Sequence, residues 1–342
     1  MVANPANPTN PIDGFTVDPT ELQYVGEDLQ RPECILAERD GSLWVADARG
    51  GVVHIRPDGS QRIITQSVAG DFAAASDESR RFTEGTLPNG LAFAENGDIL
   101  ISNFGTDLLE VMTREGETRT LYDQIDGQPI GKVNFVLRDS KNRIWITVST
   151  RVKNWMDAAI SRIVDGYVAL VDERGIRIVA DGFAFTNEIR LDAAEEWLYV
   201  VETTGRKVTR LKVAPDGELS QRETYGPEDT GGFIDGIAFD AFGNLWGTHI
   251  LHDRLFAITP DGDLRVIIDD TVAAPLEAFF AAFAEDRATP DHMLACGGSV
   301  ATWMASITFG GPDLRTAYIG SLRGTRIPYF RSPVAGLAPV HW

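Results

Sequence analysis

A short motif recurs along the chain and places a polar residue at its head five times. Each copy consists of an apolar strand, a tight turn that carries Asp, Asn or Gly, and a second strand centred on an aromatic or large aliphatic residue. The head residues are Glu33, Asn89, Asn134, Asn187 and Asp235. A sixth copy keeps the hairpin but has Ala305 at the head position. Such a repeat constrains the fold more strongly than any single segment, because every copy must take the same structure.

The spacing and the chemistry of the copies predict a six-bladed β-propeller. The copies begin roughly 45 to 70 residues apart, which is typical of propeller blades and too long for short solenoids. Turns such as Asp40-Gly41 join runs rich in Val, Ile, Leu, Trp and Tyr, as in β-hairpins. A further strand pair follows after Gly51 and after Asp253, which gives four strands per blade. We expect the first strand of each blade to line a central channel, so that the head residues form one ring.

Because most of the chain belongs to this repeat, we expect an all-β fold with a single propeller domain over residues 21–342, preceded by a polar arm over residues 1–20. The segment FTVDPTELQYV, which begins at Phe15, is a candidate outer strand of the last blade. Residues 149–166 interrupt blade three, and we interpret them either as a flap over the channel or as a surface excursion. Residues 274–287 carry apolar side chains at helical spacing and predict a packing helix between blades five and six.

Composition excludes several classes of function. The net charge of −19 disfavours nucleic-acid or anionic-membrane partners, because phosphate binding requires clustered Lys and Arg. No segment approaches the ~20 apolar residues of a membrane span, and the N-terminus has neither the basic nor the apolar part of a signal peptide. The two cysteines, Cys34 and Cys296, imply no disulfide framework, so a cytoplasmic location is expected, although one bridge between them stays open.

The ring of head residues predicts a site for a hard divalent cation. Two carboxylates and three carboxamides offer oxygen ligands, without the thiolates or paired imidazoles that are typical of zinc or copper sites. Calcium accepts such mixed coordination, and magnesium, manganese and zinc are the alternatives. The competing interpretation is structural, because Asn and Asp at strand starts often form Asx-turns. Five polar residues at equivalent channel positions favour the metal site.

Antiparallel pairing is expected to bring the end of each second strand beside the head residue of its blade. This places Glu202 near Asn187 and His249 near Asp235, as groups that orient the ligands or shift their pKa values. The equivalent residues of blades one and two begin glycine-containing turns and are interpreted as turn formers: Asp47 and Asn103.

Four segments resemble the SMP-30/gluconolactonase family: PECIL at Glu33, TNEIRLD at Asn187, IDGIAFDAFGNLW at Asp235, and FGGPDLRTAYIGS near the C-terminus. The resemblance covers nearly the whole chain. It implies a six-bladed propeller with one catalytic divalent cation, usually calcium, held at one mouth of the channel by Glu33, Asn187 and Asp235. It also implies that Asn134 binds substrate or joins the metal shell, and that Asn89 contacts substrate.

Lys132 departs from the family pattern, because some lactonases of the family have Arg at this position, where it grips sugar hydroxyls. Lys cannot form the bidentate fork of Arg, so we expect a substrate that is less sugar-like than gluconolactone. The expected reaction is metal-assisted hydrolysis of a small-molecule lactone, in which the cation stabilises the oxyanion and Lys132 lies near the leaving side. Asp235 acts either as general base or as nucleophile, and the sequence leaves these two roles open.

Three other functions remain open. The same centre could cleave phosphotriesters or fluorophosphates. A propeller lyase or condensing enzyme is the second, although strictosidine-synthase-like relatives lack the metal carboxylates that Glu33 and Asp235 provide. The third is a non-enzymatic binding module, which is disfavoured because unpaired buried carboxylates are costly.

Overall fold

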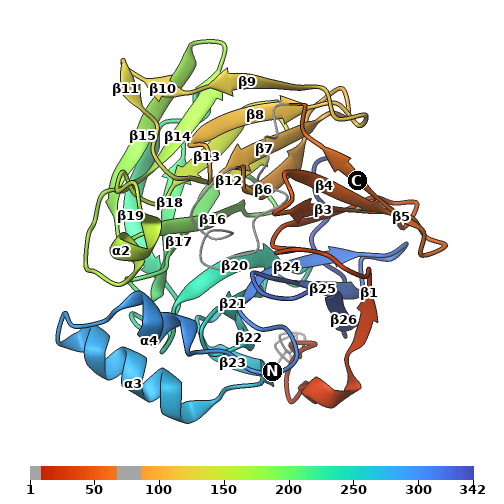
Figure 1. Cartoon of the computed structure of the whole chain (residues 1–342), viewed down its shortest axis with the longest axis vertical. Helices are drawn as coiled ribbons and strands as arrows, with labels where there is room; N and C mark the ends of the chain where they lie inside the picture. The colour runs from red at the N-terminus through yellow and green to blue at the C-terminus, as the bar shows by residue number, and fades with distance from the viewer. Residues whose placement is uncertain (1–8, 68–85) are drawn as a thin grey trace, which may run out of the picture.

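The computed structural model describes residues 9–67 and 86–342. They form six four-stranded antiparallel sheets arranged around a central axis (Figure 1). The predicted six-bladed β-propeller is confirmed. The first eight residues of the expected N-terminal arm lie outside the described residues.

The blades follow the order of the chain. Blade one consists of β2 (Ile35–Ala37), β3 (Leu43–Asp47), β4 (Gly51–Ile55) and β5 (Gln61–Thr65). Blade two consists of β6 (Pro88–Phe93), β7 (Ile99–Asn103), β8 (Leu108–Met112) and β9 (Thr118–Tyr122). Blade three consists of β12 (Val133–Arg138), β13 (Ile144–Val148), β14 (Gly166–Asp172) and β15 (Gly175–Phe183). Blade four consists of β16 (Thr186–Leu191), β17 (Trp197–Glu202), β18 (Lys207–Val213) and β19 (Leu219–Tyr225). Blade five consists of β20 (Ile234–Phe239), β21 (Leu245–His249), β22 (Arg254–Ile258) and β23 (Leu264–Asp269). Blade six consists of β24 (Met304–Gly310), β25 (Thr316–Ser321) and β26 (Ile327–Arg331), together with β1 (Gln23–Val25). A small sheet of β10 (Gln124–Ile125) and β11 (Gln128–Pro129) precedes blade three.

Strand β1 closes the ring by joining the first part of the chain to the last blade. It pairs antiparallel with β26, with Gln23 opposite Tyr329 and Val25 opposite Ile327. The expected outer strand from the segment after Phe15 is therefore confirmed. Blade six contains strands from both ends of the propeller sequence, so its ladder hydrogen bonds hold the ring closed.

Repeated contacts explain why the blades keep the same hairpin. Gly41 has a φ of 92° at the tip of its hairpin, a conformation that favours glycine. Trp145 and Trp246 occupy equivalent buried positions in the second strands of blades three and five. Each indole donates to an aspartate just after the first strand: Nε1 lies 2.9 Å from Asp139 Oδ2 and 2.8 Å from Asp240 Oδ2, respectively.

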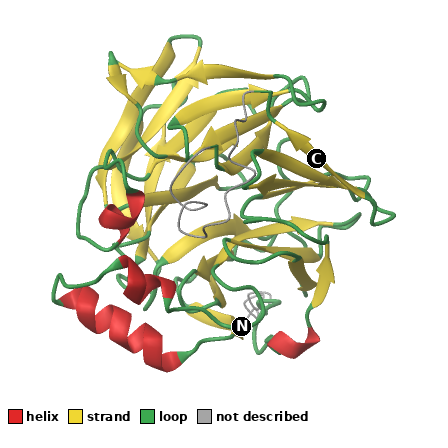
Figure 2. Ribbon diagram, viewed as in Figure 1, coloured by secondary structure: helices red, strands yellow, loops and turns green. Residues whose placement is uncertain are grey.

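Within the described residues, three α-helices accompany the sheets (Figure 2): α2 (Trp155–Ala159) interrupts blade three, and α3 (Ala273–Ala284) and α4 (Pro290–Leu294) join blades five and six. The predicted packing helix is confirmed by α3, in which Phe279 is fully buried. One apolar cluster joins the three helices to the strand-end loops at one mouth of the channel. A short 3-10 helix, η1 (Pro19–Glu21), precedes β1. Among the helices that the structure describes, none is long and apolar enough to cross a membrane.

Candidate functional site

The innermost strands contact one another around the axis, and the head residues lie on them, except for Glu33, which stands two residues before β2. In blades two to five the head residue falls inside a break in the register between the first and second strands. A β-bulge leaves a residue unpaired in the ladder and re-aims its side chain. The four residues that the breaks release in this way are Asn89, Asn134, Asn187 and Asp235.

A cavity of about 50 Å³ lies where these strands meet. All five polar head residues of the motif line it, and none of them is more than 5% exposed. Among the described residues, the polar side chains that line it are Arg31, Glu33, Asn89, Asn134, Asn187, Thr203 and Asp235. The repeat therefore brings together the residues that the sequence singled out.

Arg31, Glu33 and Asn89 form one connected group. Arg31 Nη2 donates to Asn89 Oδ1 at 2.7 Å and lies 2.9 Å from Glu33 Oε2. Asn89 Nδ2 donates to Glu33 Oε1 at 2.7 Å and to the backbone carbonyl of Asn134 at 3.0 Å. Asn89 thus positions Glu33 in this structure, and its contact with substrate stays a prediction.

Two carboxamide oxygens of the cavity, Asn134 Oδ1 and Asn187 Oδ1, accept no hydrogen bond from the described residues, and Glu33 Oε2 has only its ion pair with Arg31. The amide of Asn187 is oriented by its nitrogen, which donates to Thr203 Oγ1 at 3.2 Å. A buried acceptor without a partner costs about 1–3 kcal/mol. Oxygens left in this state are available to coordinate a ligand.

Burial raises the pKa of both carboxyl groups in the cavity. The pKa of Asp235 lies well above its usual value because of burial and the negative charges of Glu33 and Glu188, and the charge of Arg31 opposes this only in part. The pKa of Glu33 is also raised by burial, against the opposing effect of Arg31. A cation bound nearby would favour the ionised forms of both groups.

The donor set fits a hard divalent cation. Glu33 and Asp235 can supply two negative charges, and the carboxamide oxygens of Asn134 and Asn187 are unpaired. No group of three or more His, Cys, Asp or Glu side chains in residues 9–67 and 86–342 could hold a metal, so the carboxamides are needed to complete the set. A set made only of oxygens suits calcium better than zinc.

Apolar side chains close the cavity on the side of the helices. Trp155 and Ala159 come from α2, and Met293 comes from α4. The ring of Trp155 packs against Phe104 and Phe185, with centroids 5.8 Å and 6.4 Å apart. Trp155 is thus part of the cavity wall, and the insertion over residues 149–166 contributes directly to this mouth.

Lys132 is buried beside the cavity but is not part of its lining. Its Nζ lies 2.8 Å from Asp107 Oδ1 and donates to the carbonyl of Phe104 at 3.3 Å. Its charge is therefore balanced by Asp107, and its hydrogen bond supports the loop that carries Phe104. A contact with the leaving side of a substrate stays a prediction.

Glu202 and His249 also lie outside the lining of the cavity. The bulge in each of their blades places them opposite the residue that precedes the head residue, instead of opposite the head residue itself. Glu202 Oε2 accepts a hydrogen bond from the backbone nitrogen of Ala184 at 2.9 Å, and His249 Nε2 lies 3.0 Å from a threonine hydroxyl. Both side chains support strand-end loops, and an influence on a bound ion stays a prediction. The interpretation of Asp47 and Asn103 as turn formers is confirmed by their hydrogen bonds to backbone nitrogens ahead in the chain.

Among the described polar residues that line the cavity, Arg31 and Thr203 lie outside the set that the sequence predicted. Thr203 directly follows the second strand of blade four and contacts the head residue of its own blade. A comparison of the residues that follow the second strands could have found it. Arg31 stands immediately before Pro32 and Glu33, and a charged residue so close to a predicted ligand was the available signal.

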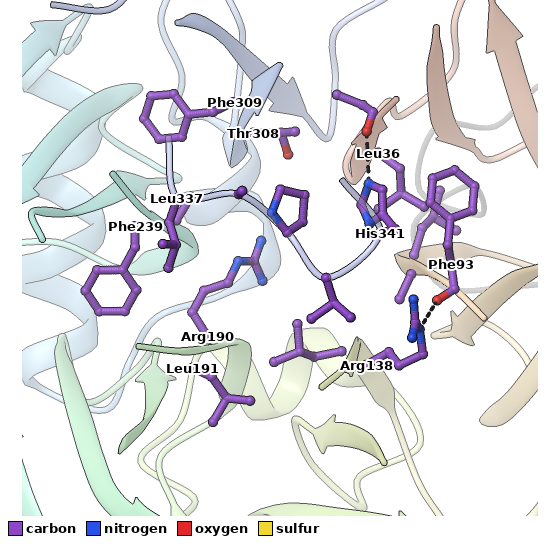
Figure 3. A pocket seen from close by; sticks show the side chains of 18 of the residues that line it. Leu36, Phe93, Arg138, Arg190, Leu191, Phe239, Thr308, Phe309, Leu337 and His341 are labelled. Carbon is purple, nitrogen blue, oxygen red and sulfur yellow. Dashed lines mark hydrogen bonds between the residues drawn. The ribbon is translucent and has the colours of Figure 1, made fainter. Parts of the chain in front are cut away.

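A second and larger cavity, of about 230 Å³, lies at the opposite mouth of the channel (Figure 3). It is lined by the ends of the first strands and by the C-terminal segment 337–341. Arg138 Nε donates to the carbonyl of Phe93 at 2.7 Å, and His341 Nε2 lies 2.9 Å from the carbonyl of Ala37. Among the described residues that line this cavity, no buried side-chain nitrogen or oxygen lacks a partner.

Residues 31–282 match the family model described as the SMP-30/gluconolactonase/LRE-like region. Among curated proteins, the 6-deoxy-6-sulfogluconolactonase of Pseudomonas putida is 25% identical over 164 residues, which cover 47% of this chain and 46% of that protein. The chain spans about half the length of the curated relatives it matches.

Solved structures share the fold at low sequence identity. A gluconolactonase from Xanthomonas campestris has a TM-score of 0.63 and 16% identity, with 93% of this chain and 90% of that chain covered. The calcium-binding protein regucalcin from Agrobacterium tumefaciens has a TM-score of 0.66 and 14% identity, with 95% and 98% covered. These likenesses establish the propeller architecture.

Proposed function

This chain belongs to the SMP-30/gluconolactonase/LRE-like family, and we propose that it hydrolyses the ring ester of a small-molecule lactone with the help of a divalent cation. One observation carries the proposal: the unpaired carboxamide oxygens of Asn134 and Asn187 lie with the carboxylates of Glu33 and Asp235 in one buried cavity. Unpaired buried oxygens destabilise a fold, so they are expected where they serve a ligand. The Pseudomonas relative is named for a lactone substrate, which supports the same class of reaction.

Calcium is the ion that this set of oxygens suits best. Glu33, Asn187 and Asp235 would hold it, with Asn134 as a fourth ligand or as a contact to the substrate. When bound, the ion supplies positive charge that polarises the ester carbonyl and stabilises the oxyanion. The shared fold with a calcium-binding regucalcin supports the choice of ion.

Asp235 is the residue that we expect to drive the chemistry. In one route its carboxylate takes a proton from the attacking water; in the other it attacks the carbonyl carbon and forms an anhydride that water then opens. In both routes the ring oxygen leaves and takes up a proton, which gives a hydroxy acid. A single turnover in ¹⁸O-labelled water separates the routes, because only the second places the label in the Asp235 carboxylate.

The remaining residues have positioning roles in this proposal. Asn89 holds Glu33 through its amide nitrogen, and the aromatic wall around Trp155 excludes bulk water from the reacting atoms. Lys132 remains our candidate for the leaving side of the substrate. To reach it, Lys132 must exchange its contact with Asp107, which is the partner of its ammonium group here.

The cavity must enlarge before a lactone ring can enter. Its volume is about 50 Å³, whereas a protein cavity that binds benzene measures about 150 Å³. Helix α2 is five residues long and supplies Trp155 and Ala159 to the wall. We expect this helix to move, because displacing one short element opens the cavity without breaking a blade.

The test is hydrolysis of a lactone panel followed by pH-stat. The panel spans aldonolactones, plain γ- and δ-lactones, bulkier aromatic lactones and one nitrophenyl phosphotriester. The protein is treated with EDTA, assayed, and assayed again after calcium is added back. Asp192→Asn serves as a matched control for Asp235→Asn, because Asp192 lines the cavity at the opposite mouth.

We expect lactone turnover that EDTA abolishes, that calcium restores, and that Asp192→Asn retains. Turnover of the phosphotriester alone would keep the metal centre but replace the proposed substrate class. If no lactone is hydrolysed although calcium binds, the lactonase proposal is wrong.

A further inference from the structure

We propose that Arg31 is an anion-binding residue of the cavity and that the substrate carries an acidic group, a carboxylate or a sulfonate, close to its ring ester. The inference rests on the proposed function, since it assigns the substrate class of the same site. It starts from a side chain that the repeated motif does not include and that the mechanism above does not use.

The guanidinium of Arg31 is only partly used in the structure. The residue is 7% exposed and lines the cavity. Its Nη2 contacts Asn89 and Glu33, whereas Nε and Nη1 have no hydrogen-bond partner in the part of the chain that the structure describes. Burying unpaired N–H donors is costly, and Arg cannot relieve the cost by losing its proton. The unpaired Nε and Nη1 lie on different edges of the planar group, so each can donate a charge-assisted hydrogen bond to one oxygen of a carboxylate or sulfonate.

The backbone supports a fixed placement of this side chain. Arg31 has a φ of 55°, which is uncommon for a residue with a long side chain, and Pro32 follows it. The backbone nitrogen of Glu33 donates to the carbonyl of Arg31 at 2.8 Å. Strained conformations of this kind persist at ligand sites, where the surroundings determine them. The turn therefore holds an arginine and a carboxylate together at the cavity wall.

The charges in the cavity lead to the same conclusion. Glu33 and Asp235 are the carboxylates among its described lining residues. If both serve a divalent cation, their two negative charges are neutralised and the positive charge of Arg31 has no counterpart in the lining. The nearby carboxylate of Glu188 is already paired with Arg190 at 2.8 Å. A buried charge without a partner is strongly unfavourable, so an anionic ligand completes the site.

The test is a binding measurement that needs no turnover. The probes are 3-oxocyclopentane-1-carboxylate and its carboxamide, which have the size of a γ-lactone but lack the hydrolysable ester. Calorimetry on the calcium-loaded protein is expected to show that the carboxylate binds about tenfold or more tightly than the carboxamide, as for a charge-assisted hydrogen bond. Sulfate is expected to compete with the carboxylate probe in the unmutated protein.

Variants assign the preference to one side chain. Arg31→Gln is expected to abolish the carboxylate preference, and Arg31→Lys to retain part of it, because Lys keeps the charge but loses the fixed planar set of donors. Arg138→Gln makes the same change of charge at the opposite mouth and is expected to keep the full preference. Circular dichroism of each variant checks the fold.

Equal binding of the two probes to the unmutated protein, or binding of neither, would overturn the proposal. So would a preference that survives in a folded Arg31→Gln variant. If Arg31→Gln does not fold, a lack of sulfate competition in the unmutated protein decides against the proposal. The readout is independent of the lactone assay, so a protein that fails to hydrolyse lactones but shows the Arg31-dependent preference refutes only the proposed reaction.

Discussion

The two mouths of the channel differ in how completely their buried polar groups are paired. At the helix-covered mouth, four buried side-chain atoms of Arg31, Asn134 and Asn187 have no hydrogen-bond partner among the described residues. At the opposite mouth the cavity is larger, about 230 Å³ against 50 Å³, but the buried polar atoms of the described residues that line it are paired. The difference teaches that volume alone does not identify the functional site. The clustering of unpaired polar atoms in one cavity is the more informative feature, because a fold retains such atoms at a cost in stability.

The C-terminal segment accounts for the pairing at the opposite mouth. The backbone nitrogen of Leu337 donates to the carbonyl of Phe239 at 2.9 Å. The ring of His341 packs edge-on against Phe93, 4.8 Å between centroids, and its Nε2 lies against the carbonyl of Ala37 (Figure 3). The C-terminal segment occupies the opposite mouth of the channel, so we assign it a role in the stability of the fold.

The largest effect is expected from Asp235→Asn, which removes one charge from the helix-covered mouth. We expect kcat on the best lactone to fall about 10³-fold, as when a group that acts in the transition state is removed. Without metal, the variant should be at least as stable as the unmutated protein, because burial and the charge of Glu33 disfavour the Asp235 carboxylate. Pre-steady-state kinetics and thermal unfolding after EDTA treatment measure the two effects. Near-normal kcat at saturating calcium would exclude Asp235 as the catalytic carboxylate.

Glu33→Gln tests the difference between the two mouths by its effect on calcium affinity. The variant keeps the size of the side chain but removes a charged oxygen ligand, so calcium affinity should fall about 100-fold. Terbium can report binding, because Trp155 and Trp303 line the cavity and can sensitise its luminescence. Glu195→Gln makes the same change at the opposite mouth and should leave affinity unchanged. Equal affinities for the two variants would contradict the assignment of the ligand.

A histidine at the helix-covered mouth should make the fold sensitive to acid. Burial and the charge of Arg254 lower the pKa of His252 to about 4, so its neutral form is favoured in the folded protein. The unfolded chain binds the proton at a higher pH, so stability is lost as pH falls from about 6.5 through 4. We expect about 2 kcal/mol of this loss to disappear in His252→Gln. Urea unfolding between pH 4 and 8 checks the slope, and identical slopes for both proteins would refute the assignment.

The smallest effect is expected at the opposite mouth. His341→Ala removes the contact with the carbonyl of Ala37 and the packing on Phe93, so the free energy of unfolding should fall by about 1 kcal/mol. Lactone turnover and calcium affinity should not change. A variant that folds normally but loses activity would show that the opposite mouth takes part in function, and the comparison would then fail.

The ring of head residues was predictable because a repeat places equivalent residues at equivalent positions, and the inner strands of a propeller face the axis. The pairing register at the ends of the second strands could not be predicted, because it depends on bulges beside the head residues. Gly90 and Gly236 allow close approach there, since a Cβ would lie 2.7 Å from Phe135 Cα and 2.4 Å from the carbonyl of Ala305. Blade four has Glu188 at the equivalent position and still contains a bulge, so the presence of glycine does not by itself predict where the bulges lie.

Other parts of the site depend on segments that do not repeat. Arg31 reaches the cavity from a loop before the first blade, through a positive φ that its sequence does not specify. The cavity wall contains Trp155 and Met293 from inserted helices whose packing partners are distant in the sequence. Tertiary contacts of this kind have no periodic signal, which is why the flap could be located but its role in the cavity could not.

The most direct test of the account is anomalous diffraction from crystals of the EDTA-treated protein soaked in manganese, with calcium as a second ion. The account predicts one strong peak in the smaller cavity, within coordination distance of oxygens of Glu33, Asn187 and Asp235. A peak at the opposite mouth, or no peak near these three residues at saturating metal, would contradict the claim that the unpaired oxygens form a metal centre.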